Sequence, residues 1–361
     1  MMIIRPITTA DHDALWHIAN KTGPGFTSLQ PNEEAVKNKL KWALESWSDT
    51  PPEEALYLLV LEDATTGQVV GICGIESAVG LSAPWYNYKI STNIHASKEL
   101  NVYSRHETLA MCSDHTGYSE LCTLFLDQEY RHSGNGHLLS KSRLLFLASH
   151  PDRFNKNIIA EMRGYSNSEG QSPFWEALGR HFFTVDYHTA DQQVSQGKAF
   201  IAELMPRHPI YVNLLPEDAQ AAIANTHDNT VAARKILESE GFKYTGYVDI
   251  FDAGPLLETP IDNIRAIRES SLYHVKIDPD ATYSENGPWL LANDKLNEFR
   301  CIMGSPSFEA PAFINLTPEQ AEALMVSEND LVRVVPMVKK SLHTKKIKVA
   351  QHTHRKLGDR S

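Results

Sequence analysis

Two glycines preceded by an arginine mark the segment of this sequence best suited to chemistry. Residues 131–136, Arg-His-Ser-Gly-Asn-Gly, stand between the apolar run 121–126 and a segment of helical periodicity that begins at His137. Such a loop brings unpaired backbone amides to a helix N-terminus, where the helix dipole favours negative charge. The glycines let a ligand approach the backbone closely. The pattern predicts a pyrophosphate site; the alternative is a strand–turn–helix connection whose glycines only make the turn.

Other phosphate-binding loops fit this segment poorly. No Gly-Lys-Ser or Gly-Lys-Thr follows the second glycine, which excludes a Walker loop. The glycine spacing and the opening arginine also differ from the dinucleotide-binding fingerprint.

The loop and several longer stretches of sequence resemble known acyltransferases. Arg131-x-x-Gly134-x-Gly136, between a strand and a helix, resembles the acyl-CoA loop of the GNAT N-acyltransferase superfamily. Longer stretches of sequence between Met1 and about residue 270 resemble one family, the arginine N-succinyltransferases, and occur in the same order as in that family. The remainder of the chain matches less well. The matching words are HASKELNVY (95–103), SELCTLFLD (119–127), GNGHLLSKSR (134–143), AEMRG (160–164), SPFWEALG (172–179), KAFIAELMPRHPIY (198–211) and YVDIFDAGP (247–255).

The resemblance implies an acyltransferase. Its reaction would convert succinyl-CoA and L-arginine to CoA and N-succinyl-L-arginine, the first step of the succinyl route of arginine catabolism. Succinyl-CoA would be a co-substrate, and no permanently bound cofactor is expected. An α-amino group with a pKa near ~8 is mostly protonated at neutral pH. The reaction therefore needs a general base, an oxyanion donor and a proton for the leaving thiolate.

The resemblance also assigns residues to the CoA molecule. In GNAT proteins the strand before the loop diverges from its neighbour and leaves backbone groups for the pantetheine arm. Here the strand residues are Leu124, Phe125 and Leu126, and Leu124 matches the family's succinyl-CoA position. The pyrophosphate would be held by Arg131, Gly134, Asn135 and Gly136. Leu124 is also a plausible core leucine, and both interpretations hold together because its backbone would make the contact.

His227 is the candidate acid or base among 16 histidines. It lies in a polar loop before a helix N-terminus, where the dipole disfavours imidazolium. A surface histidine is the more common explanation of this placement, but the resemblance aligns His227 with the family's active-site proton donor. His95, His115 and His208 lie in matched words and are the alternatives.

The charges of the two substrates require charged partners. Arg163, after a predicted strand, is a candidate for the succinyl carboxylate because arginine binds carboxylates bidentately. A structural ion pair with Glu120 or Glu161 is the alternative. For the guanidinium of the substrate arginine, Glu76, Glu120 and Asp252 are candidates that the sequence does not rank.

The elements that must position these residues predict an α/β fold. Strands are expected over 3–6, 56–62, 68–75, 85–95, 121–126, 157–162 and 244–251, and helices over 9–21, 33–47, 173–179, 216–225 and 231–240. This order is typical of a GNAT-like mixed sheet with flanking helices. A helix, Gly-Phe and strand pattern at 176–185 and again at 235–250 predicts a second GNAT-like half.

Four parts are expected along the chain. Residues 1–200 would form the GNAT-like acyl-CoA-binding domain, and 201–275 the second half with the catalytic histidine. Residues 276–338, with strands expected over 290–303, 313–316 and 331–338, would form a small β-rich accessory domain that serves packing or oligomerisation. Residues 339–361 carry eight Lys or Arg against one acid and predict a solvated, disordered basic tail rather than a nucleic-acid contact.

Composition sets the class of protein. The 361 residues are 42% hydrophobic and 22% charged, ordinary for a globular enzyme. The net charge of −11 disfavours nucleic acid as the main ligand. Four cysteines without metal-like or disulfide-framework spacing indicate free thiols in a reducing cytoplasm. The sequence shows neither a signal peptide nor an apolar run of ~20 residues, so we expect a cytoplasmic protein without membrane contact.

Other functions stay open at this point. Within the enzyme class, the alternatives are another acyl group in place of succinyl and ornithine in place of arginine as the acceptor. From another class, the chain would be a non-catalytic acyl-CoA-binding regulator whose basic tail touches nucleic acid. Homo-oligomerisation is compatible with the sequence, which does not fix the oligomeric state.

Overall fold

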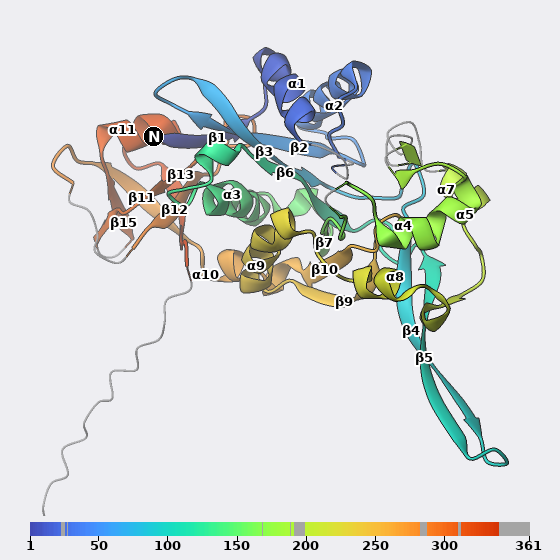
Figure 1. Cartoon of the computed structure of the whole chain (residues 1–361). Helices are drawn as coiled ribbons and strands as arrows, with labels where there is room; N and C mark the ends of the chain where they lie inside the picture. The colour runs from blue at the N-terminus through green and yellow to red at the C-terminus, as the bar shows by residue number, and fades with distance from the viewer. Residues whose placement is uncertain are drawn as a thin grey trace, which may run out of the picture.

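The structure is a computed structural model that describes residues 1–22, 26, 28–167, 169–187, 189–190, 199–281, 287–309 and 312–338. The predicted basic tail, 339–361, lies outside these described residues. A mixed sheet with helices on both faces forms the body of the molecule (Figure 1). The predicted mixed α/β architecture is therefore confirmed. In the described part of the chain, no helix is long and apolar enough to cross a bilayer.

One sheet of 16 strands runs through the described residues, in the order β14-β15-β11-β16-β12-β13-β1-β2-β3-β6-β7-β10-β9-β4-β5-β8. Along the chain these strands are β1 (Met2–Pro6), β2 (Leu56–Asp63), β3 (Gln68–Glu76), β4 (Asn87–Ser97), β5 (Val102–Cys112), β6 (Ser119–Leu126), β7 (Asn157–Glu161), β8 (Ile210–Tyr211), β9 (Lys243–Val248), β10 (Pro255–Pro260), β11 (Ser271–Ile277), β12 (Trp289–Asn293), β13 (Cys301–Gly304), β14 (Ser307–Glu309), β15 (Phe313–Leu316) and β16 (Leu331–Pro336).

Capping residues mark some of the helix ends. Ser172 and Thr317 accept hydrogen bonds from backbone amides of the helices that follow them, and Gly241 ends its helix with φ +111°. The α-helices are α1 (His12–Lys21), α2 (Glu33–Ser46), α3 (Asn135–Ser149), α4 (Pro173–Ala177), α5 (Gly179–Phe183), α7 (Ala199–Leu204), α8 (Glu217–Ala222), α9 (Val231–Glu240), α10 (Arg265–Glu269) and α11 (Pro318–Leu324).

The centre of the sheet is covered on both faces. Helices α1 and α2 lie on one face, and α3, α9 and α10 lie on the other (Figure 1). Strand β2 is accordingly apolar on both sides. Its side chains alternate between the two cores: Leu56, Leu58 and Val60 pack with α1 and α2, and Tyr57, Leu59 and Leu61 pack with α3.

Strands β4 and β5 form a long hairpin that projects from the body (Figure 1). The two strands pair from Asn87 opposite Cys112 to Ser97 opposite Val102. Sequence analysis predicted part of β4 but missed β5. Large apolar side chains are exposed toward the tip of this hairpin, among them Leu100 and Tyr103.

Two other expectations need correction. Residues 290–303, expected as a single strand, form the antiparallel pair β12 and β13. Residues 176–185, expected as a helix followed by a strand, form parts of the short helices α4 and α5 and then a turn. Thr184 adopts φ +56° at the end of α5, and Phe183 packs against Trp175 with ring centroids 5.2 Å apart, so the chain folds back instead of extending.

The C-terminal strands continue the main sheet through β1. Ile4 of β1 lies opposite Cys301 of β13 on one side and opposite Leu61 of β2 on the other. The N-terminal strand therefore joins the strands β11–β16 to the strands that carry the glycine loop 131–136.

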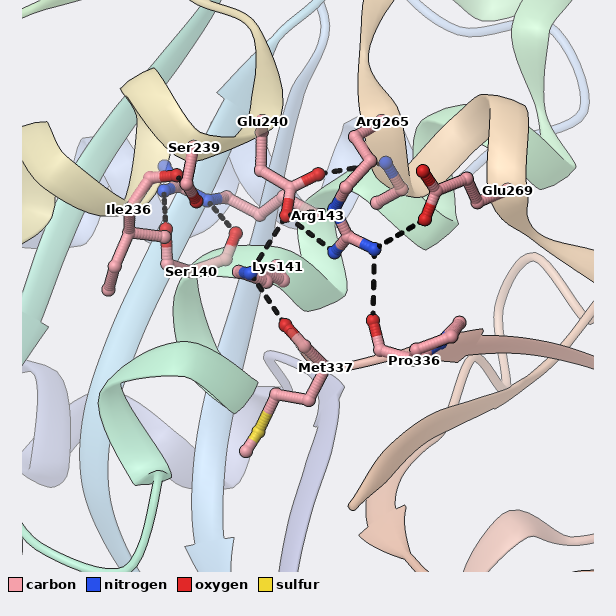
Figure 2. Close-up of polar contacts among 11 residues, drawn as sticks. Ser140, Lys141, Arg143, Ile236, Ser239, Glu240, Arg265, Glu269, Pro336 and Met337 are labelled. Atoms are coloured by element: carbon pink, nitrogen blue, oxygen red, sulfur yellow. Dashed lines mark hydrogen bonds and ion pairs between the residues drawn. The ribbon is translucent and has the colours of Figure 1, made fainter. Parts of the chain in front are cut away.

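Buried ion pairs also connect α3 to α9 and α9 to α10 (Figure 2). The Glu240 carboxylate at the end of α9 lies 2.8 Å from the Lys141 ammonium of α3 and 2.7 Å from the Arg265 guanidinium of α10. Lys141 and Arg265 also donate to the carbonyl oxygens of Met337 and Pro336, respectively. All three charged side chains are nearly inaccessible to water, so each depends on its partners.

Candidate active site

An opening between β6 and β7 dominates the site. Strand β6 pairs antiparallel with β3 as far as Leu126, but it pairs with the parallel strand β7 only at Ser119 and Glu120. Beyond Glu120 the backbone of β6 has no ladder with β7. Because the strands are parallel, their carboxyl ends lie at one edge of the sheet, where an extended ligand can reach the free backbone groups of β6.

The predicted pantetheine residues lie along this free edge. The side chains of Leu124 and Leu126 pack into the hydrophobic core on the side of the sheet that α3 covers. Phe125 packs on the opposite face, where its ring lies 6.5 Å from that of Phe26. Side chains therefore leave β6 toward both faces of the sheet, and its backbone edge faces the opening.

The glycine loop lies at the carboxyl end of β6. Gly134 adopts φ +83° and precedes α3, whose first intrahelical hydrogen bond runs from the Leu138 amide to the Gly134 carbonyl over 3.0 Å. The amides of Gly136 and His137 precede this bond at the N-terminus of the helix, where backbone amides can bind an anion. A Cβ atom on Gly136 would meet only Leu126 Cδ2, at 4.0 Å, so the space beside Gly136 is open.

The side chains of Arg131 and Asn135 form hydrogen bonds with backbone carbonyls at the two ends of the segment that leads into the loop. The Arg131 Nε donates to the Leu126 carbonyl over 3.0 Å, and the Asn135 amide donates to the Tyr130 carbonyl over 3.0 Å. Arg131 remains exposed, so its charge stays at the mouth of the loop. Asn135 is buried and holds the turn closed.

The C-terminal strands contact the same loop. A Cβ atom on Gly134 would lie 2.8 Å from Met337 Cε and 3.3 Å from Met303 Sδ. These two methionines pack under the glycine and leave no room for a side chain. The part of the chain expected only to serve packing or oligomerisation therefore forms one wall of the loop.

Arg163 and His227 lie side by side after β7. The His227 amide donates to the Arg163 carbonyl over 2.9 Å, and the adjacent residues Gly164 and Thr226 form an isolated antiparallel bridge. The Arg163 guanidinium donates to Ser166 Oγ over 3.3 Å.

Hydrogen bonding fixes the proton position on His227. The Asn229 amide donates to His227 Nδ1 over 3.2 Å, so neutral imidazole carries its proton on Nε2. Partial burial and, secondarily, the positive charge of Arg163 lower the pKa of His227, while Asp228 opposes this effect. The ring is therefore neutral near pH 7 and presents an N–H donor at Nε2.

Asp252 holds the Arg163–Gly164 segment in place. Its carboxylate accepts from the Gly164 amide over 2.7 Å, the Gly254 amide over 2.8 Å and the Tyr187 hydroxyl over 3.3 Å. Burial and the neighbouring Asp249 raise the pKa of Asp252 to about 8. These backbone contacts argue against Asp252 as the partner of a substrate guanidinium.

The other acidic candidates occupy a different place. Glu76 and Glu120 lie directly opposite one another on β3 and β6. Glu120 is also the last residue of β6 that pairs with β7, so this pair stands at the narrow end of the opening.

The alternative histidines lie in other surroundings. His115 is buried, with its ring nitrogens 3.2 Å from Asn87 Oδ1 and 2.8 Å from Glu258 Oε2. His95 lies on the projecting hairpin beside Tyr211, and His208 is exposed. None of these three shares the contact that His227 makes with Arg163.

Sequence reasoning did not anticipate the roles of Asn229 and Asp252. The turn 249–254, Asp-Ile-Phe-Asp-Ala-Gly, carries the usual composition of a tight turn, which was the available signal for Asp252. Nothing in the local sequence indicates that its carboxylate reaches Gly164, which is distant in the chain.

Comparisons with known proteins agree over nearly the whole chain. Residues 2–266 match the family model of the arginine N-succinyltransferase beta subunit, and residues 273–336 match that of its C-terminal domain. Proteins named arginine N-succinyltransferase from Citrobacter koseri and Escherichia coli are 49% and 48% identical to this chain, each over 93% of it and 97% of the relative.

A solved structure shares the fold. It is described as arginine/ornithine succinyltransferase subunit AI from Pseudomonas aeruginosa, and it superposes with a TM-score of 0.85 at 34% identity. The match covers 93% of this chain and 99% of that one. Together with the family models and the curated relatives, it shows that the chain belongs to the arginine N-succinyltransferase family.

Proposed function

We propose that this protein transfers the succinyl group of succinyl-CoA to the α-amino group of L-arginine, giving CoA and N-succinyl-L-arginine. The observation that carries the proposal is the contact between His227 and Arg163 at the end of β7, beside the opening that exposes the β6 backbone. An acid–base group and a cation for a carboxylate thus stand together where an acyl chain would arrive.

The CoA molecule is proposed to lie along β6. Its pyrophosphate would contact the amides of Gly136 and His137 and the exposed charge of Arg131. Its pantetheine arm would follow the backbone of Leu124–Leu126 through the opening. The open space beside Gly136 supports this placement, because no protein atom there requires a glycine.

Charge complementarity orients the two substrates. The succinyl carboxylate would pair with Arg163, whose guanidinium holds one long hydrogen bond to Ser166 within the described residues. Glu76 and Glu120, at the narrow end of the opening, are the proposed partners for the substrate guanidinium. Asp252 is not proposed for that role, because its carboxylate accepts hydrogen bonds from backbone amides.

The chemistry is a direct attack within a ternary complex. The neutral α-amino nitrogen attacks the thioester carbon, and the C–S bond breaks as the tetrahedral intermediate collapses. The nitrogen gives up one proton and the sulfur gains one. His227 Nε2, which carries the proton of the neutral ring, would give that proton to the leaving sulfur and then take up the proton released by the nitrogen.

An assay of thiol release tests the proposal directly. Release of free CoA thiol should follow mixing of succinyl-CoA with L-arginine. His227→Ala should lower kcat by ~10²–10⁴ while calorimetry shows CoA binding close to wild type. His208→Ala removes an exposed histidine outside the site and should keep the wild-type rate. A folded wild-type protein that binds CoA without turnover would overturn the proposal.

The same assay separates the alternatives within the enzyme class. Ornithine in place of arginine, and acetyl-CoA in place of succinyl-CoA, should each react more slowly. A preference for either would redirect the assignment.

We also propose that the enzyme works in the cytoplasm, in the succinyl route of arginine catabolism. Its free cysteines support a reducing compartment: Cys73, Cys122 and Cys301 are buried, and Cys112 is half-buried. In the proposed domain organisation, residues 1–200 bind acyl-CoA and residues 201–275 carry the catalytic histidine. Residues 276–338 form an accessory unit. Detection of the native protein in cell fractions, and of N-succinyl-L-arginine in cells that express it, tests these assignments.

A further inference from the structure

Arg143 is a buried cation that the proposed chemistry does not use. It lies on α3 and is 1% exposed. Its Nη1 donates to the carbonyl oxygens of Cys122 and Gly74 over 3.3 and 3.4 Å, and its Nε and Nη2 donate to Ser140 of its own helix. Among the ion pairs formed by the described residues, Arg143 takes part in none, whereas the equally buried Arg265 pairs with Glu240.

Such an arrangement is costly. A guanidinium taken out of water loses several kcal/mol of solvation, which neutral carbonyl acceptors only partly restore. Burial lowers the pKa of Arg143, but a guanidinium stays charged in proteins. A neutral side chain of similar length would fill the same space at lower cost. The charge itself therefore calls for an explanation other than stability.

The two carbonyls that Arg143 binds flank a β-bulge. Gly74 lies opposite Cys122 and Ile72 opposite Phe125, so the single residue between Ile72 and Gly74 faces two residues of β6. Those two residues are Thr123 and Leu124. The bulge thus falls on the strand that borders the opening.

Thr123 holds a strained conformation in this bulge. Its φ is +50°, which β-branched residues rarely adopt, and its buried Oγ1 lacks a hydrogen-bond partner in the described part of the chain. Strain of this kind persists only where the surrounding structure imposes it, and it is concentrated at functional sites. Arg143, joined to the carbonyl of the preceding residue, is part of what imposes it.

The charge also acts through the peptide bond. The Cys122 carbonyl and the Thr123 amide belong to one peptide group. A cation bonded to the carbonyl oxygen polarises this group and makes its N–H a stronger donor. The bulge therefore combines an altered backbone direction with a raised positive potential at the edge of the opening.

We propose that Arg143 is a positioning residue for acyl transfer. It fixes the bulged backbone at Thr123 and Leu124, and its charge favours the negative charge that develops on the thioester oxygen during attack. The proposal rests on the proposed function, because that function places the thioester in the opening between β6 and β7. Arg143 itself touches no substrate.

Three variants test this role. Arg143→Met removes the charge at similar length, and Arg143→Lys keeps a charge without the fork that spans two carbonyls. Arg265→Met is the matched control, a buried arginine whose partners are Glu240, Glu269 and Pro336. Turnover is measured per folded protein, and CoA and succinyl-CoA affinities are measured separately. The infrared stretch of a ¹³C-labelled thioester carbonyl is recorded in bound succinyl-CoA without arginine.

We expect kcat to fall at least tenfold in Arg143→Met and by less in Arg143→Lys. Affinity for CoA, which has no thioester carbonyl, should stay close to wild type. The carbonyl stretch should move back toward its value in solution in Arg143→Met. Arg265→Met should lower the melting temperature but keep the wild-type kcat and carbonyl stretch.

Wild-type kcat and carbonyl stretch in both Arg143 variants would overturn the proposal and leave Arg143 a packing residue. If Arg143→Met does not fold, Arg143→Lys decides between these outcomes by the same two readouts. Absence of turnover in the wild type would instead overturn the proposed function, and the carbonyl stretch would still report on Arg143.

Discussion

The backbone amide of His227 donates to the carbonyl oxygen of Arg163, with nitrogen and oxygen 2.9 Å apart. Asp252 holds the next residue, Gly164, so the pair is fixed from the opposite side as well. Burial and, after it, the positive charge of Arg163 lower the pKa of His227. The protonation of the proposed acid–base group therefore depends on the proposed carboxylate partner.

Replacement of Arg163 should shift the pH dependence of the reaction upward. Burial and the charge of Arg163 together lower the pKa of His227, and Arg163→Gln removes the second cause. The pKa should then rise toward the ordinary histidine value. The acid limb of the kcat/KM profile, where imidazolium forms, should move to higher pH by the same amount. NMR titration of His227 gives an independent reading, and Arg207→Gln, at an exposed position, should leave both unchanged.

The same variant should lose selectivity for a charged acyl group. A charge-assisted hydrogen bond contributes ~1.5–3 kcal/mol, which corresponds to roughly tenfold to a hundredfold in kcat/KM. Wild type should prefer succinyl-CoA over butyryl-CoA, which lacks the terminal carboxylate, and Arg163→Gln should lose most of that preference. An unchanged ratio of the two kcat/KM values would show that another group binds the carboxylate.

The two glycines of the loop should respond differently to alanine. Gly134→Ala places a Cβ 2.8 Å from Met337 Cε at φ +83°, so we expect a loss of ~1 kcal/mol or more in the free energy of unfolding. Gly136→Ala meets only Leu126 at 4.0 Å and should fold normally.

CoA binding then distinguishes these variants. The added methyl group of Gly136→Ala occupies the space proposed for the pyrophosphate, so calorimetry should show weaker CoA binding at unchanged stability. Wild-type affinity in that variant would place the pyrophosphate elsewhere.

Glu240 should matter for stability and not for the chemical step. Glu240→Gln leaves the buried Lys141 without its anion and leaves Arg265 paired with Glu269 alone. Removal of one partner of a buried pair costs ~3–5 kcal/mol. Urea denaturation should show this loss, while kcat per folded molecule stays at the wild-type value. Glu33→Gln, which breaks an exposed pair with Lys37, should produce no measurable change.

Local features of the fold could be predicted from the sequence because their causes are local. Ser172 and Thr317 cap helices through neighbouring amides, and Gly241 ends α9 in the left-handed conformation that glycine favours. The turn into α3 follows in the same way from Gly134. Each depends on a few consecutive residues, so spacing alone was informative.

Features that depend on distant segments could not be predicted. The hairpin strand β5 lacks a buried face over its outer half, so no alternation of apolar residues marked it. Thr123 is a strand former by type, and only the contacts of β6 with β3 and α3 place it at φ +50°. The contact between Arg163 and His227 joins two loops through backbone atoms, which side-chain patterns do not report.

The pairing of β1 with β13 has a consequence for biosynthesis. Ile4 meets Cys301 only after about 300 further residues have been made, which at ~5–20 residues per second takes ~15–60 s. Until then the outer edge of β1 has no strand to pair with, and Gly134 lacks the two methionines beneath it. A nascent chain that has already made His227 would therefore still lack one wall of its glycine loop. The loop is complete only once Met303 and Met337 have been made, after the proposed catalytic residue.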